Sequence, residues 1–149
     1  MAPPPELLSA AVLVGGGLLN GGAVEVVNST FSGNAAPGAG GGIRNTGQIS
    51  LAHVTLYNNT APFGGGVQNM ATTRVQSSVI AGNLPGNCSD PLFSLGHNLE
   101  DTDTCSLVPG QNDLVGVSPA LEPLADNGGP AMTHALAEGS PAIDAADNA

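Results

Sequence analysis

The sequence predicts an all-β protein, a single-stranded parallel β-helix, because one block of residues recurs at a fixed period. A glycine triplet, an apolar residue and, two positions later, an asparagine begin at Gly15, Gly40 and Gly64, in steps of 25 and 24 residues. Self-similarity at this period is typical of solenoids, in which each coil buries its apolar face by stacking on its neighbour. We therefore expect about three coils of 24–25 residues, followed by an irregular C-terminal cap.

The segments after each glycine triplet alternate as β-strands do. Val24 and Val26 are two residues apart, and the same spacing recurs in the next two repeats (Ile49 and Leu51, Thr73 and Val75). A period of two places these side chains on one buried face of a strand. A third short segment places Phe31, Leu56 and Ile80 at equivalent sites. Helical repeats are disfavoured because no apolar stripe at helical spacing occurs, and the L-x-x-L-x-L core of a leucine-rich repeat is absent.

Asparagine recurs at two positions of every coil. Stacking in register predicts two ladders of side-chain amides, because the asparagine side chain tolerates corners and bonds to backbone groups. We interpret these six residues as structural and not as ligands of a bound molecule. The ladders are expected to consist of Asn20, Asn45 and Asn69, and of Asn34, Asn59 and Asn83.

The composition limits the partners that this chain can have. Among 149 residues, twelve are acidic and two are arginine, so the formal net charge is −10. Binding to nucleic acid or to anionic lipid requires a basic patch, which the sequence does not provide. The apolar run at residues 7–14 is too short to span a bilayer, so we expect no membrane insertion. No cofactor is predicted.

The two cysteines, Cys88 and Cys105, lie in the least repetitive part of the chain. Such a pair in a loop-rich segment predicts a disulfide if the protein is exported. Zinc is the alternative, but no C-x-x-C motif occurs, and His97 and His134 do not have the spacing of zinc ligands. The sequence therefore favours a disulfide and an oxidising compartment.

Three regions are expected along the chain: an N-terminal cap or degenerate first coil at 1–14, the coils at 15–83 and an irregular cap at 84–149. The apolar run at 7–14 has no basic residue before it, so it does not resemble a signal peptide. The chain is therefore expected to be a fragment or to have a truncated start. We expect one group of cap residues to close the end of the coil (Leu92, Phe93, Leu95 and Leu99) and another to run back along a flank (Leu121, Leu124, Leu136 and Ile143).

The C-terminal third contains an ordered series of short motifs. They include Ser94-Leu-Gly-His-Asn-Leu99, Asp126-Asn-Gly-Gly129 and Gly139-Ser-Pro-Ala-Ile-Asp144. This series resembles the choice-of-anchor Q domain of bacterial surface proteins, and the preceding coils resemble the right-handed parallel β-helix repeats that usually lie before that domain. The resemblance implies an exported cell-surface protein.

Parallel β-helices also include polysaccharide-processing enzymes such as pectate lyases, by analogy of fold alone. A lyase of that type needs a basic residue beside a cluster of acids, and Arg44 and Arg74 are the only candidates for the base. Glu25 is the only acid within 15–83, so the paired carboxylates of a glycoside hydrolase cannot be assembled in the coils. The alternative hypothesis is a fragment of such an enzyme whose catalytic coils lie upstream or are degenerate.

The acidic run Glu100-Asp101-Thr102-Asp103 has oxygen ligands that suit Ca²⁺, and Asp101 and Asp103 are its candidate ligands. The remaining positions of a known calcium loop are absent, so we interpret the run as a solvated acidic loop. Overall, the sequence favours a non-catalytic structural or adhesive module, secreted or at the cell surface. Its expected partners are a glycan or a protein, with end-to-end self-association through the exposed N-terminal edge as a further expectation.

Overall fold

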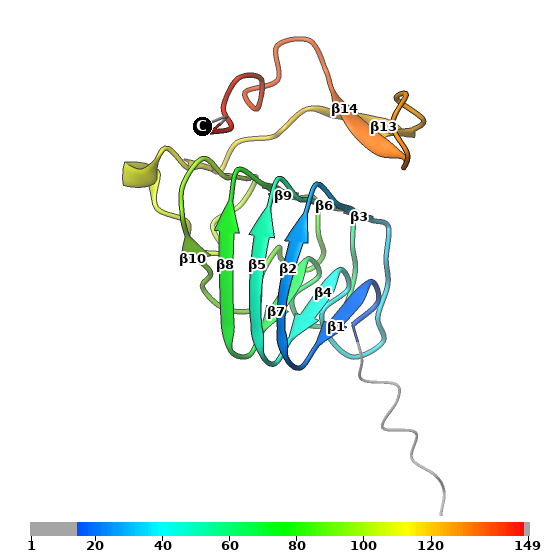
Figure 1. Ribbon diagram of the computed structural model, residues 1–149, viewed down its shortest axis with the longest axis vertical. Coiled ribbons are helices and arrows are strands. Elements are labelled where there is room, and N and C mark those ends of the chain that lie inside the picture. The colour runs from blue at the N-terminus through cyan, green and yellow to red at the C-terminus, as the bar shows by residue number, and fades with distance from the viewer. Residues whose placement is uncertain (1–14, 148–149) are drawn as a thin grey trace, which may run out of the picture.

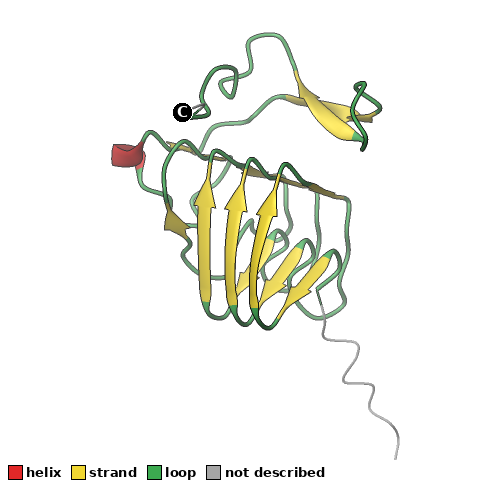
Figure 2. Cartoon of the chain, viewed as in Figure 1, coloured by secondary structure: helices red, strands yellow, loops and turns green. Residues whose placement is uncertain are grey.

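The computed structural model describes residues 15–147, so the predicted N-terminal cap at 1–14 lies outside the described residues. Three parallel sheets wind around a common axis and form a parallel β-solenoid, which confirms the predicted fold class (Figures 1 and 2). Each of the first three coils gives one strand to each sheet. The coils consist of β1 (Leu18–Asn20), β2 (Ala23–Val27) and β3 (Thr30–Ser32); β4 (Ile43–Asn45), β5 (Gln48–Ala52) and β6 (Thr55–Tyr57); and β7 (Val67–Asn69), β8 (Thr72–Gln76) and β9 (Val79–Ala81).

The register of the sheets confirms the predicted core columns. Phe31 lies opposite Leu56, and Leu56 lies opposite Ile80, on three successive strands. Leu56 and Ile80 are fully buried, whereas Phe31 is only partly buried. Val24 was also expected to point into the core but is 38% exposed. Among residues 15–147, only the second coil packs on the first one, and the apolar residues of the first coil keep part of their contact with water.

The glycine triplets are explained by close packing of successive coils. A Cβ atom on Gly41 would lie 2.5 Å from the Gly65 carbonyl oxygen and 2.6 Å from the Thr60 amide nitrogen. Real Cβ atoms do not approach backbone atoms so closely, so only glycine fits at this position. The first glycine of a triplet has a different reason: Gly40 and Gly64 adopt positive φ angles of 65° and 56°, which glycine reaches without a steric penalty.

The winding continues beyond residue 83, where the sequence predicted that the irregular cap begins. The strands of this region are β10 (Phe93–Ser94), β11 (Leu99–Glu100) and β12 (Leu114–Val115). β10 pairs with β8, β11 with β9, and β12 with β11, all in parallel. The coils shorten at the same time. Along the sheet of β3 the step between paired residues falls from 25 to 24, 20 and 15 (Thr30, Thr55, Val79, Leu99 and Leu114).

The end of the core is closed by a different set of residues from the one predicted. Leu92 and Leu99 are buried as expected, but Phe93 is 61% and Leu95 is 48% exposed. The reason is the alternation along β10, where Ser94 points inward between them. Leu107 and the two cysteines are buried in the core cluster instead.

The remaining cap residues lie alongside the coils (Figure 1). They form an antiparallel hairpin of β13 (Leu121–Ala125) and β14 (Thr133–Leu136), and a short 3₁₀ helix, η2 (Pro109–Gln111), precedes β12. The predicted apolar flank is not buried, since Leu124, Leu136 and Ile143 are each at least 39% exposed. Within residues 15–147, no helix has the length and apolarity needed to cross a membrane.

Truncating a leucine of the buried core column and truncating an exposed leucine are expected to lower the free energy of unfolding by very different amounts. Leu56→Ala is expected to lower the free energy of unfolding by about 2–5 kcal/mol, because it leaves a cavity inside the solenoid. Leu19→Ala removes the same atoms from a side chain that is 50% exposed, and it should cost under about 1 kcal/mol. Urea denaturation measures both. Equal losses would contradict the assigned register.

Candidate functional site

Both predicted asparagine ladders form. Asn34 Nδ2 donates to Asn59 Oδ1 at 3.0 Å, and Asn59 Nδ2 donates to Asn83 Oδ1 at 2.9 Å. In the second ladder, Asn20 Nδ2 lies 2.9 Å from Asn45 Oδ1, and Asn45 Nδ2 lies 3.4 Å from Asn69 Oδ1. Every amide donates toward the next coil along the chain. Each ladder therefore has an N–H donor left at its C-terminal end, and this donor needs an acceptor.

The first ladder ends on carboxylates. Asn83 Nδ2 donates to Asn87 Oδ1 at 2.9 Å, and Asn87 Nδ2 then lies 2.8 Å from Asp101 Oδ1 and 3.3 Å from Glu100 Oε1. A carboxylate can end such a chain because it accepts hydrogen bonds and donates none. The second ladder ends on the Pro91 carbonyl oxygen, 2.9 Å from Asn69 Nδ2.

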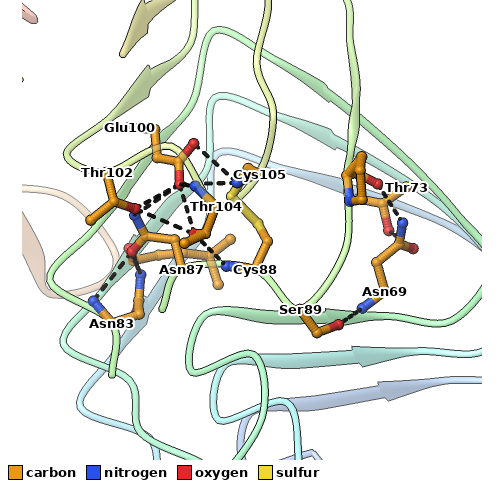
Figure 3. Close-up of a disulfide and its surroundings, with 12 residues drawn as sticks. Asn69, Thr73, Asn83, Asn87, Cys88, Ser89, Glu100, Thr102, Thr104 and Cys105 are labelled. Atoms are coloured by element: carbon orange, nitrogen blue, oxygen red, sulfur yellow. Dashed lines mark hydrogen bonds between the residues drawn. A yellow bond between two sulfur atoms is a disulfide. The ribbon is translucent and has the colours of Figure 1, made fainter. Parts of the chain in front are cut away.

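Glu100 occupies a core position. It pairs with Ile80 in the sheet and is fully buried, so the prediction of a solvated acidic loop is wrong for this residue. Its carboxylate accepts hydrogen bonds from the backbone amides of Thr104 and Cys105, at 2.8 and 3.1 Å, and from the Thr102 hydroxyl at 2.8 Å. Figure 3 shows these donors converging on the carboxylate beside the disulfide. Such bonds offset the cost of burying a charge.

The predicted disulfide joins Cys88 and Cys105, 17 residues apart. Cys88 lies opposite Val67 in an isolated parallel bridge, so the disulfide ties the segment that pairs with β7 to the segment that follows β11. Closing a loop of this length stabilises a fold by about 3 kcal/mol in the chain-entropy model. The bond also indicates an oxidising compartment.

A third polar column was missed by the sequence reasoning. The Val54 amide donates to Ser78 Oγ, the Ser78 amide donates to Asn98 Oδ1 at 3.1 Å, and Asn98 Nδ2 donates to Asp113 Oδ1 at 3.0 Å. This column also ends on a buried carboxylate, since Asp113 is 4% exposed. Its residues change identity from coil to coil, so the repeat did not reveal them.

The two calcium candidates are placed differently. Both carboxylate oxygens of Asp101 accept protein hydrogen bonds, from Asn87 Nδ2 and from the Gly82 amide at 2.8 and 2.9 Å, whereas Asp103 is exposed. Across residues 15–147, no group of three or more His, Cys, Asp or Glu side chains is arranged to hold a metal ion.

His134 connects the hairpin to the coils. Its Nε2 lies 2.7 Å from Ser32 Oγ, its Nδ1 lies 2.8 Å from the Glu122 carbonyl oxygen, and its ring packs edge-on against Tyr57 at 4.9 Å. A second histidine, His97, lies 2.9 Å from the Ala145 carbonyl oxygen. These contacts hold the cap against the coils, in place of the apolar flank that the sequence predicted.

A groove lies on the sheet of β1, β4 and β7, and we take it as the candidate functional site. Its volume is about 370 Å³, within the range of roughly 300–1,000 Å³ that is typical of small-ligand sites. Two loops of equivalent position supply apolar walls, and two strands supply one polar side chain each. The lining residues are Pro37, Gly38, Ala39, Arg44, Pro62, Phe63 and Gln68.

Arg44 and Gln68 reach this groove because of the strand period. The residues on either side of Arg44 point into the core and are buried, and the same holds for Gln68. The two lie opposite each other on β4 and β7. Sequence reasoning weighed Arg44 only as the base of a lyase. The repeat did contain a sign of the groove, because Pro37 and Pro62, which form part of its walls, are 25 residues apart.

Arg74 lies on a different sheet. It projects from β8, pairs with Ser50 on β5, and its guanidinium lies 5.8 Å from the centre of the Phe93 ring. Glu25 lies on β2, opposite Ser50 on the other side. The structure therefore separates the two arginines that the sequence offered as catalytic candidates.

No family model matches this chain, and no curated protein or solved structure gives a significant match. The fold and its bonding define the class of protein: a parallel β-solenoid with internal asparagine ladders, a disulfide and a C-terminal antiparallel hairpin.

The role of Glu100 predicts a cost for an isosteric change. Glu100→Gln places an NH₂ donor among groups that are themselves donors, so it is expected to lower the free energy of unfolding by about 2 kcal/mol. Glu122→Gln, at an exposed position of the hairpin, is the matched control and should stay within about 0.5 kcal/mol of the parent. Chemical denaturation compares the two. An unchanged Glu100→Gln variant would contradict the proposed ladder end.

If calcium stabilised the cap, added Ca²⁺ would raise the melting temperature. The hydrogen bonds of Asp101 argue against such a site. Because Asp101 is engaged by two donors, we expect the melting temperature to be equal in EDTA and in excess Ca²⁺. Differential scanning calorimetry measures it. A rise of several degrees in Ca²⁺ that Asp101→Asn abolishes would establish a calcium site at this loop.

Proposed function

We propose that this chain is a non-catalytic structural and adhesive module of an extracellular bacterial surface protein, the end of a β-solenoid stalk together with its cap. The observation that carries the proposal is the way in which the C-terminal end of the solenoid is closed. One polar column stops on the buried Glu100 and the half-buried Asp101, another stops on the buried Asp113, and a disulfide closes the coil beside the first. Such an end covers the apolar cross-section and sheet edges that a solenoid would otherwise expose.

The motifs that resemble the choice-of-anchor Q domain support the finer assignment, because their residues make the contacts of the cap. Asn98, from the first motif, bonds to Asp113. The Asp126 carboxylate accepts the Gly128 amide at 2.9 Å within a turn. Ser140, from the last motif, is buried and donates to the Pro119 carbonyl. Each motif of the series thus lies at an ordered position of the cap, which supports the finer assignment.

The experiment is an adhesion assay with the full chain. Beads coated with the protein are passed in flow over surfaces that bear mucin-type glycoprotein, acidic and neutral polysaccharides, or matrix protein. We expect retention on at least one surface, and we expect no retention of beads whose protein has been reduced and alkylated. Retention on none of these surfaces would contradict an adhesive role.

The alternative, a fragment of a polysaccharide-processing enzyme, is tested on the same surfaces. Soluble products released from the acidic polysaccharides are measured with and without Ca²⁺. We expect no release above that of the reduced and alkylated protein. Release that depends on the folded chain would contradict the non-catalytic assignment and favour the enzyme.

A further inference from the structure

The groove at Arg44 pairs two planar polar groups at a short, fixed spacing. Arg44 and Gln68 lie on adjacent parallel strands, about 4.8 Å apart. A guanidinium presents donors in a rigid fork that matches a carboxylate, whereas an amide both donates and accepts. Together they can meet a ligand that carries a carboxylate next to hydroxyl groups.

Gln68 gives a second reason to expect a hydroxyl-bearing ligand. Its Oε1 is buried and has no hydrogen-bond partner among the described residues. Leaving a buried acceptor unpaired destabilises the protein. Because this oxygen is closed to solvent, a ligand hydroxyl reaches it only when the Gln68 side chain turns toward the groove that it lines, and the new bond then removes that destabilisation.

The walls of the groove offer an apolar surface beside this polar pair. Phe63 is 66% exposed, and Pro37 and Pro62 line the same groove. The face of an aromatic ring carries partial negative charge and attracts groups with partial positive charge. The C–H groups on one face of a sugar ring have that character, so a pyranose can stack on Phe63 while its substituents reach Arg44 and Gln68.

The charge distribution favours an anionic ligand on the coils over one on the cap. Residues 15–83 contain two arginines and one acid, a formal charge of +1, whereas residues 84–149 contain ten acids and no basic residue, a formal charge of −10. No acidic residue lines the groove. An anion is therefore attracted to Arg44 and repelled by the cap.

We propose that this groove binds an acidic glycan, with a uronate carboxylate on Arg44, a neighbouring hydroxyl on Gln68 and the sugar ring against Phe63. The inference rests on the proposed adhesive function and names the chemical class of its partner. A neutral glycan lacks the charged contact, and a purely apolar ligand would leave Arg44 and Gln68 facing a surface with no acceptors or donors.

The test uses the full chain and two soluble probes. One is a tetra-uronate, and the other is the same tetrasaccharide with its carboxyl groups reduced to hydroxymethyl groups. Isothermal titration calorimetry at 0.15 M salt should detect binding of the first and at least tenfold weaker binding of the second. Arg44→Gln and Phe63→Ala should each weaken tetra-uronate binding at least tenfold, a loss of about 1.4 kcal/mol or more.

Arg74→Gln is the matched control, since it removes the other arginine of the coils on a different sheet, and it should change affinity less than twofold. Circular dichroism and melting temperature verify that each variant is folded. The proposal is overturned if the tetra-uronate does not bind, if the reduced probe binds equally well, or if Arg44→Gln behaves like Arg74→Gln. Retention of the beads on a protein surface alone would leave the adhesive function standing and refute the glycan, so the two failures are distinguishable.

Discussion

The structure depends on the direction of the hydrogen bonds that its buried asparagines make. Along a ladder each side-chain amide donates one N–H to the next asparagine, so one donor group is left at the C-terminal end and requires an acceptor there. An unsatisfied buried donor costs about 1–3 kcal/mol, and a column that ended without an acceptor would destabilise the last coil. Asp101, Glu100 and Asp113 supply these acceptors. Part of the acidic character of the cap is therefore a structural consequence of the ladders.

The end of the solenoid is also formed by shortening its coils. The step between paired residues falls to 15 at β12, so the chain needs fewer residues to close each turn. Cys88 and Cys105 join two points of this shorter winding, and Glu100 stands in the column that Leu56 and Ile80 occupy in earlier coils. An apolar residue in its place would leave the backbone amides of Thr104 and Cys105 without the carboxylate that accepts from them. The shorter coils, the disulfide and the carboxylates that end the ladders are thus all found at the C-terminal end of the solenoid.

Concentrating acids in the cap leaves the outer surface of the coils almost uncharged. Two arginines project there from different sheets. Arg44 lies in the groove that Phe63 lines, and Arg74 lies against the ring of Phe93 on another sheet. The same alternation that buries the neighbours of Arg44 and Gln68 places these two side chains side by side outside. A solenoid therefore offers a binding surface without disturbing its core. The acids lie in the cap and the arginines lie on the coils, which supports a role in which the cap closes the structure and the coils contact a partner.

The period, the strands, both asparagine ladders and the disulfide follow from the sequence, because each of these recurs at a constant step or has one possible partner. The repeat did not reveal the short strands β10, β11 and β12 that continue the parallel sheets, since the step to β11 is 20 residues and Glu100 replaces an aliphatic residue. Sequence reasoning also misplaced the residues that close the core, because Ser94 and not Phe93 points inward. The repeat places the walls of the groove at Arg44 in equivalent positions, but whether they enclose a groove depends on how the loops fold. The column that ends on Asp113 depends on the tertiary structure alone, because it joins residues of different identity on successive coils and only the register of the stacked strands brings such residues together.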